Sequence, residues 1–265
     1  AEYISTSETV TFTALASDPN NDTSTYTWTA DGGTFNNNSG RTVNWIAPAI
    51  EGIFNITVQV KDNGNLSAQA GTKILVRNFN SQEGKLLAYY PFTGNTQDIS
   101  GNLLHGQGIG TVLVPDKNNK PNSAYYFNGG TQHIKVANSP ILNSISGITV
   151  SCWVNASSLP EKETFLLSHG SWQNRWKLSF TPEKFLRWTV NTMNGIGDLD
   201  AADDFRTDSF YHVIAAYDGS LMTIYINGIL NAYKPLTGNI RTTSLPLLMG
   251  QMLEDNAEYN FKGIL

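Results

Sequence analysis

The chain has 265 residues, with 17 basic and 22 acidic side chains and a formal net charge of −5. This balance argues against a nucleic-acid-binding protein, because phosphate contacts need clustered Lys and Arg. A hydrophobic fraction of 40% argues against disorder. No apolar run reaches the ~18 residues of a membrane span, and the first residues lack the basic and apolar regions of a signal peptide.

The cysteine content bears on the compartment. Cys152 is the single cysteine, which excludes an intrachain disulfide but does not exclude export. The chain is also rich in Asn, Ser, Thr and Gly and poor in Lys and Glu. We therefore expect an extracellular or cell-surface β-protein.

Hydrophobic and polar residues alternate through the first part of the chain, a pattern typical of half-buried strands. The clearest strands are predicted at Glu8–Ala16, Tyr26–Ala30 and Phe54–Val60. Turn clusters such as Asp18–Asp22 separate them. Six or seven such strands predict an immunoglobulin-type β-sandwich over residues 1–78. The polar run that follows predicts a linker at 79–85.

Period-two patterning continues through residues 86–265, with no helical stretch. Asp218-Gly219 separates two predicted strands within Ser209–Gly228, a strong tight-hairpin signal. Further strands are predicted at Leu86–Phe92, Ser123–Phe127, His133–Val136, Ile148–Val154, Thr164–His169, Arg175–Phe180, Lys184–Val190, Ile229–Tyr233 and Leu245–Gly250. About a dozen strands in one unit predict two large packed sheets, a jelly roll. The predicted fold class is therefore all-β throughout.

Five blocks of residues 86–265 resemble laminin-G-like, concanavalin-A-like jelly-roll domains of bacterial surface proteins. They lie at Tyr89–Gly106, Ala124–Gly129, Gly147–Asn155, Tyr211–Gly228 and Phe261–Leu265 (FKGIL). In that family FKGIL-type blocks continue with Asp and a closing strand, so we expect the last strand to be truncated. Residues 1–78 resemble PKD- or cadherin-like modules through YTWTADGGTF, VNWIAP and GIFNITVQVKDNG. The resemblance implies a module of a larger extracellular protein, often with carbohydrate recognition, and we expect the module to be a monomer.

Carbohydrate sites combine aromatic plates with polar or cationic groups, and the tryptophans suggest where such a site lies. Strand alternation places Trp176 and Trp188 in the core, since large aromatic side chains dominate cores. Candidate sugar contacts are Trp172 in a predicted loop, the outward-facing Arg175, Lys177 and Arg187, and Trp153 on the outer face of its own strand. The alternative for Trp153 is a position covered by a loop.

A turn in the first jelly-roll block is a candidate calcium site, since the family often holds a structural calcium there. Its predicted ligands are Asn95, Asp98 and Asn102, because Ca²⁺ binds carboxylate and amide oxygens. The alternative is a plain Asx-turn. Weaker acidic groups are Glu254, Asp255 and Glu258 in one segment and Asp18, Asn20, Asp22 and Asp62 in the small domain. For these the alternatives are a solvated loop and a turn.

Catalytic patterns are missing from the sequence. Glycoside hydrolysis needs two positioned carboxyl groups, and no strand carries a Glu-x-Asp-x-x-Glu pattern. The carboxylates of Gly197–Asp208 are predicted to form a solvated rim. Cys152 falls on the core-facing side of its strand and is expected to be inert, and His212 is expected to be structural.

Three functional hypotheses follow, and the first is preferred. It is a non-catalytic, lectin-like module that binds a polysaccharide or glycan, with calcium as its single expected cofactor. The second is a structural or adhesive segment that binds proteins and has no glycan site. The third, a remote alternative, is a glycoside hydrolase.

Overall fold

The computed structural model describes residues 3–17, 23–50, 52–64, 66–77, 86–159, 161–201, 205–256 and 258–265. The chain divides into two compact units, Ala1–Gly84 and Lys85–Leu265. The linker predicted at 79–85 and the turn Asp18–Asp22 lie outside the described residues. Among the described residues, no helix has the length and apolar character that crossing a membrane requires.

The first unit is a sandwich of two small sheets. One contains β1 (Tyr3–Ser5), β7 (Ser67–Arg77), β6 (Gly52–Lys61) and β3 (Thr25–Ala30), in that order; the other contains β2 (Thr9–Thr13), β5 (Thr42–Ile46) and β4 (Thr34–Phe35). Trp28, Trp45 and Ile56 are buried between them. Each tryptophan also fixes a loop, since Trp28 Nε1 donates to the carbonyl of Gly40 and Trp45 Nε1 to that of Gly32. The predicted immunoglobulin-type sandwich is confirmed.

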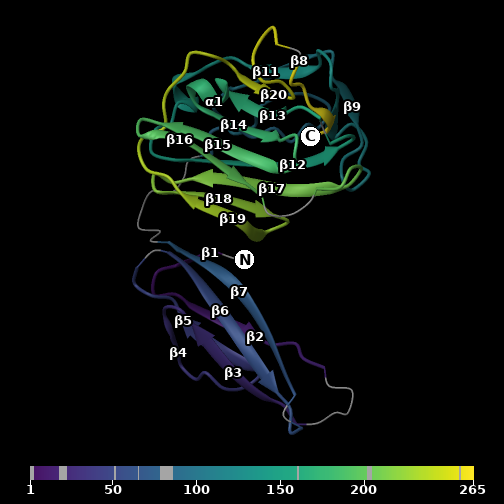
Figure 1. The fold of residues 1–265 in the computed structure, drawn as a ribbon. Coiled ribbons are helices and arrows are strands. Elements are labelled where there is room, and N and C mark those ends of the chain that lie inside the picture. The colour runs from purple at the N-terminus through teal and green to yellow at the C-terminus, as the bar shows by residue number, and fades with distance from the viewer. Residues whose placement is uncertain are drawn as a thin grey trace. The chain divides into compact units, whose positions relative to one another are not determined.

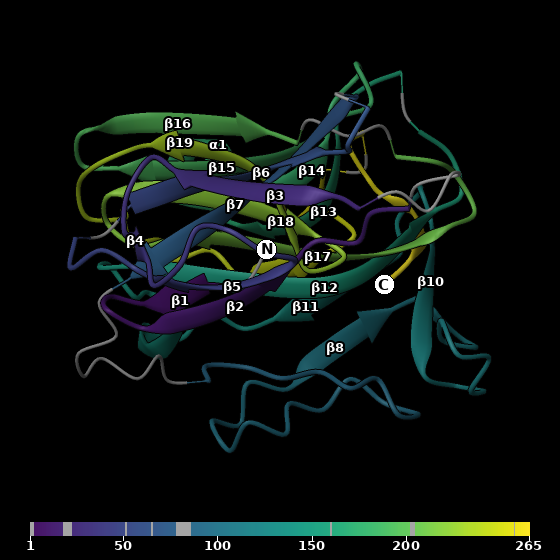
Figure 2. The same cartoon turned by 90° about the horizontal axis from the view of Figure 1, so that it is seen from below.

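The second unit consists of two seven-stranded sheets, which form the two layers seen in Figures 1 and 2. The β14 sheet has the order β16 (Gly195–Asp200), β15 (Leu186–Thr192), β14 (Trp176–Phe180), β13 (Thr164–His169), β20 (Leu247–Met249), β11 (His133–Val136) and β8 (Gly106–Ile109). The β17 sheet has the order β19 (Ile229–Pro235), β18 (Leu221–Ile226), β17 (Phe210–Tyr217), β12 (Ile148–Ala156), β21 (Lys262–Ile264), β10 (Ala124–Asn128) and β9 (Val112–Val114). All neighbouring strands of both sheets pair antiparallel.

The main hydrophobic core of this unit lies between the two sheets. The β14 sheet contributes Trp176, Leu178 and Trp188, all buried, as strand alternation predicts. The two indole rings lie 5.6 Å apart between centroids. From the β17 sheet, Tyr217 and Met222 pack into the same core. The sequence therefore identified the inner face of β14 and β15 correctly.

Three predictions of local structure are wrong. The segment Leu86–Phe92 forms no strand; its Tyr89 N–H donates to the carboxylate of Asp98 instead of to a neighbouring strand. Part of the predicted rim Gly197–Asp208 belongs to strand β16, where Leu199 is buried and Asp198 and Asp200 face the other way. The predicted loop after β13 contains a one-turn helix, α1 (Ser171–Asn174). Strands β8 and β9 were also not predicted from the sequence.

The core role of Trp188 yields a stability prediction. We expect Trp188→Ala to lower the free energy of unfolding of the second unit by roughly 3–5 kcal/mol, because the lost ring leaves a cavity. Trp172→Ala, at a side chain 42% exposed, should change it by less than about 1 kcal/mol. Calorimetry of the full chain measures both. Equal destabilisation by the two variants would contradict the assignment of Trp188 to the core.

Candidate functional site

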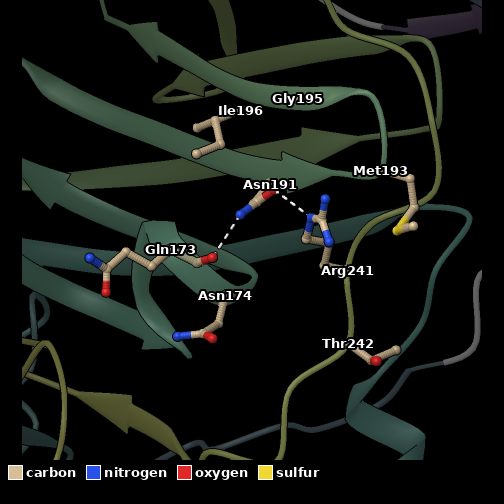
Figure 3. Close-up of a pocket in the computed structure, with 8 residues that line it drawn as sticks. All are labelled: Gln173, Asn174, Asn191, Met193, Gly195, Ile196, Arg241 and Thr242. Atoms are coloured by element: carbon tan, nitrogen blue, oxygen red, sulfur yellow. Dashed lines mark hydrogen bonds between the residues drawn. The ribbon is translucent and has the colours of Figure 1, made fainter.

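A pocket of about 710 Å³ lies at one end of the β14 sheet, where three segments distant in sequence meet (Figure 3). The segments are helix α1, the end of β15 with its turn into β16, and residues 241–242. The lining residues are Gln173, Asn174, Asn191, Met193, Gly195, Ile196, Arg241 and Thr242. The pocket thus combines amide, hydroxyl and guanidinium groups with two apolar side chains.

Asn191 holds these segments together. Its side chain is buried and lies between the α1 residues and Arg241 (Figure 3). Nδ2 donates to the carbonyls of Trp172, at 3.2 Å, and Gln173, at 2.8 Å, while Oδ1 accepts from Arg241 Nε at 3.1 Å. Its backbone is also engaged, since N–H donates to the Arg175 carbonyl and C=O accepts from the Arg241 N–H. One residue therefore fixes both walls of the pocket.

The rim of the pocket is partly apolar. Met193 and Ile196 line it and are exposed. Trp172 belongs to the same short helix as Gln173 and Asn174, and its side chain is 42% exposed. Sugars present hydroxyl groups and apolar C–H faces. The polar groups of the pocket can bond the hydroxyls, and the apolar side chains can pack against the C–H faces. The prediction that Trp172 lies outside the core is confirmed.

The expectation that Arg175 faces outward is wrong. Its side chain is completely buried, and its guanidinium donates to His169 Nδ1 at 3.1 Å and to the Ser144 carbonyl. His169 is buried too, and its Nε2 lies 3.1 Å from Asn138 Oδ1. Burial, and then the charge of Arg175, lower the pKa of His169 to about 4, against the opposing effect of a hydrogen bond with the Leu245 backbone. Arg175 is thus a buried cation beside a neutral imidazole.

Lys177 and Arg187 lie opposite the core face of their strands, as predicted, but both are already paired. Lys177 is buried and forms an ion pair with Glu163, with Ser179 bonded to both. Arg187 forms a two-point ion pair with Asp200, with N–O distances of 2.6 and 2.8 Å. The expectation that Lys177 lines an exposed surface is wrong, because Glu163 and its strand neighbours cover it.

Trp153 lies on β12, in the sheet opposite the one that carries α1 and the pocket. Its ring is 41% exposed and stacks on His212 with a centroid distance of 5.0 Å. Lys117 Nζ lies 4.2 Å from the ring centroid, and Ser151 Oγ lies 2.9 Å from His212 Nε2. Trp153 and Trp172 therefore belong to different surfaces of the unit.

The predicted calcium ligands are all engaged in hydrogen bonds with the chain. The carboxylate of Asp98 accepts from the N–H groups of Tyr89, Ser100 and Leu104 and from the Ser100 hydroxyl, at 2.8 to 3.0 Å. Asn102 Nδ2 donates to the carbonyls of Leu86 and Leu87, and Asn95 Oδ1 accepts from the Gln97 N–H. Calcium binding at this turn stays a prediction.

Burial acts to raise the pKa of Asp98, but the hydrogen bonds from Tyr89, Ser100 and Leu104 outweigh it and lower the pKa below its usual value. The turn therefore holds an ionised carboxylate at neutral pH. No group of three or more His, Cys, Asp or Glu residues close enough to hold a metal occurs in the described ranges.

The other acidic groups are dispersed. Glu254 pairs with Lys135 and Glu258 with Lys162, while Asp62 accepts from the Leu66 N–H at 2.8 Å. The residues Asp18, Asn20 and Asp22 lie outside the described part of the chain. Cys152 packs against the core, and burial raises the pKa of its thiol to about 12, which agrees with an inert side chain.

Comparison with known families defines the class of this protein. A model described as the concanavalin A-like lectin/glucanases superfamily matches residues 128–265, more than half of the chain. The chain therefore belongs to this superfamily, as the laminin-G-like sequence blocks predict. A PKD domain model matches residues 1–76, which agrees with the predicted first module. No curated protein matches the chain in sequence.

Solved structures match this chain at low sequence identity. Domain 4 of AbnA, a GH43 extracellular arabinanase from Geobacillus stearothermophilus in complex with arabinotriose, has a TM-score of 0.54 and 21% identity, over 68% of this chain and 88% of that one. A Trypanosoma rangeli sialidase has a TM-score of 0.49 and 12% identity, over 83% of this chain and 43% of that one. The arabinanase domain is similar to this chain in fold alone.

Sequence reasoning missed Asn191 and Arg241, although it identified Trp172 nearby. Asn191 shares the outward face of β15 with Arg187 and Thr189, so alternation alone places it off the core. Arg241 lies in no strand and in no recognised block. Because 50 residues separate it from Asn191 in the chain, local patterns carry no signal for their contact.

The turn at Asp98 yields a testable prediction. We expect Asp98→Asn to lower the free energy of unfolding by about 2 kcal/mol, because a neutral amide accepts fewer hydrogen bonds than the carboxylate. The groups that bind the Asp98 carboxylate are N–H and O–H donors of the chain, which do not depend on calcium. The loss of stability measured in thermal melts should therefore be the same with calcium and with EDTA. A calcium-dependent rise of the melting temperature in the wild type but not in Asp98→Asn would instead support the predicted calcium site.

His169 should make stability depend on pH. Its folded pKa, about 4, lies below its ordinary value of 6.5, so the unfolded chain binds the proton more tightly. The stabilisation is complete above pH 6.5 and is lost as the pH falls toward 4, with a full effect of roughly 3 kcal/mol. His169→Gln keeps one donor and one acceptor without titrating. Melting curves between pH 4 and 7 should show a shallower loss in this variant, and identical slopes would contradict the assignment.

Proposed function

We propose that this chain is a non-catalytic carbohydrate-binding module of a secreted or surface protein, with its glycan site in the pocket beside Trp172. The observation that carries the proposal is Asn191, which fixes the backbone of α1 and the guanidinium of Arg241 on opposite sides of one pocket. Such a site is preorganised, so it loses little conformational entropy when a ligand binds.

Chemistry and fold support the same function. The pocket offers polar groups for sugar hydroxyls, and exposed Trp172, Met193 and Ile196 provide apolar surface nearby. The similar arabinanase domain was solved in complex with arabinotriose, which supports glycan binding but not a particular sugar. PKD and concanavalin-A-like domains are typical of extracellular proteins, which supports secretion or surface display, and we propose a bacterial source.

The absence of catalysis is part of the proposal. Glycoside hydrolysis needs two carboxyl groups that are free to act on the glycosidic bond. On the outer face of the β14 sheet, Asp200 is bonded to Arg187, Asp198 to Thr189, and Glu163 to Lys177. Each is thus committed to a partner within the protein. Incubation with polysaccharides should release no reducing ends; measurable release would favour the glycoside hydrolase.

The two exposed tryptophans allow a matched experiment. A glycan array of the full chain, with and without EDTA, should identify a ligand class for titration calorimetry. We expect Trp172→Ala to weaken binding by roughly ten-fold or more, because tryptophan is enriched among the residues that contribute most of the binding energy once a partner covers them. Trp153→Ala removes an equally exposed ring from the other sheet and should leave affinity unchanged.

Two outcomes would contradict the proposal. Loss of binding in Trp153→Ala but not in Trp172→Ala would move the site to the β17 sheet. An array without any saturable glycan binding would favour the structural or adhesive segment with protein partners. Binding that EDTA abolishes would add calcium to the site.

A further inference from the structure

We propose that the glycan bound in this pocket carries an anionic group, a carboxylate or a sulfate, which Arg241 binds. The inference rests on the proposed function and specifies its ligand. Its basis is the distribution of charge around the pocket: the lining contains a guanidinium and no carboxylate. The guanidinium of Arg241 is therefore the only charged group among the described residues of the lining.

Arg241 is held in a position that leaves its binding groups available. Its Nε donates to the buried Asn191 Oδ1, and its backbone N–H donates to the Asn191 carbonyl at 3.0 Å. The side chain is exposed, and within the described part of the chain no carboxylate pairs with it. The two terminal nitrogens of a guanidinium form a planar fork that matches a carboxylate or sulfate by two parallel hydrogen bonds.

Two cations on the outer face of the β14 sheet show the contrast. Lys177 is paired with Glu163, and Arg187 is paired with Asp200. The chain therefore supplies carboxylates for the cations that stabilise this face. Arg241 lines a pocket and has no such partner among the residues that the structure describes, which is the arrangement expected where the ligand brings the counter-charge.

Arg175 strengthens the positive character of this end of the sheet. It directly follows Asn174, a lining residue, and its carbonyl accepts from the Asn191 N–H at 2.7 Å. Its guanidinium is buried, contacts His169 and Ser144, and has no carboxylate partner among the described residues, while its Nε lacks any hydrogen bond there. Burial lowers the pKa of Arg175 to about 10, so the side chain stays charged at neutral pH. A charge that is buried and lacks a counter-charge acts over a longer distance than one exposed to water, because water screens it less.

Matched pairs of polysaccharides test this directly on the full chain. Polygalacturonate and its methyl ester share one backbone and differ in free carboxylates; a sulfated galactan and its desulfated form differ in sulfates. We expect the wild type to bind one anionic member roughly 10- to 100-fold more tightly than its neutral counterpart, the loss expected when a charged hydrogen-bond pair is removed. The pair that discriminates identifies the anion.

Variants separate a specific contact from general attraction. Arg241→Gln should remove the preference for the anionic member, and Arg241→Lys should retain part of it, since the charge remains but the fork is lost. Arg206→Gln is the matched control: Arg206 is exposed and follows the Asp200 end of β16, whereas the Gly195 end borders the pocket. The Arg206→Gln variant should bind the anionic polysaccharide with the affinity of the wild type. Melting temperatures establish that each variant is folded.

The possible failures are distinguishable. Binding of neutral glycans that depends on Trp172 but not on Arg241 would overturn the anionic ligand and leave the proposed function intact. Equal weakening by Arg206→Gln and Arg241→Gln, with a steep salt dependence, would show diffuse attraction and also overturn it. Absence of binding to all four polysaccharides and to the glycan array would overturn the proposed function itself.

Discussion

The amide of Asn191 is the interaction on which the candidate site depends. Helix α1 has four residues, too few to be stable alone, so its position is set by contacts outside the helix. Asn191 supplies them by donating to the carbonyls of Trp172 and Gln173, while its oxygen orients Arg241. An amide that both donates and accepts is suited to this, since a carboxylate could not bond two carbonyls and a lysine could not accept from a guanidinium.

The polar outer face of the β14 sheet explains how such a buried amide is tolerated. Strands β13, β14 and β15 are buried on both faces, and on the outer one polar groups satisfy each other. Two ion pairs lie on this face, Lys177 with Glu163 and Arg187 with Asp200. Such pairs contribute little net stability, but they fix side-chain positions. Arg175 breaks this pattern, because its neighbours are a neutral imidazole and a carbonyl. Arg175 therefore carries a charge that no carboxylate among the described residues compensates.

Local patterns were sufficient for most of the fold and insufficient for the site. The core positions of Trp176 and Trp188 follow from alternation, and the Asp218-Gly219 hairpin follows from turn chemistry. Strand β16 was missed because Gly and Asp are unfavourable in strands, and its formation depends on pairing with β15. Arg175 was predicted to be exposed because alternation gives the side of a strand and not what covers it. The contact of Asn191 with Arg241 arises from tertiary structure and has no local signal.

Two tryptophans of nearly equal exposure illustrate why exposure alone does not define a binding site. Trp153 is 41% and Trp172 42% exposed. The ring of Trp153 already contacts His212 and the ammonium of Lys117, so a sugar would have to displace partners that the chain provides. Trp172 instead belongs to helix α1, which is fixed through its backbone and whose next two residues, Gln173 and Asn174, line the pocket together with Arg241. A guanidinium that Asn191 holds through its Nε, in a pocket without a carboxylate among its described lining residues, is what distinguishes this site from the surface around Trp153.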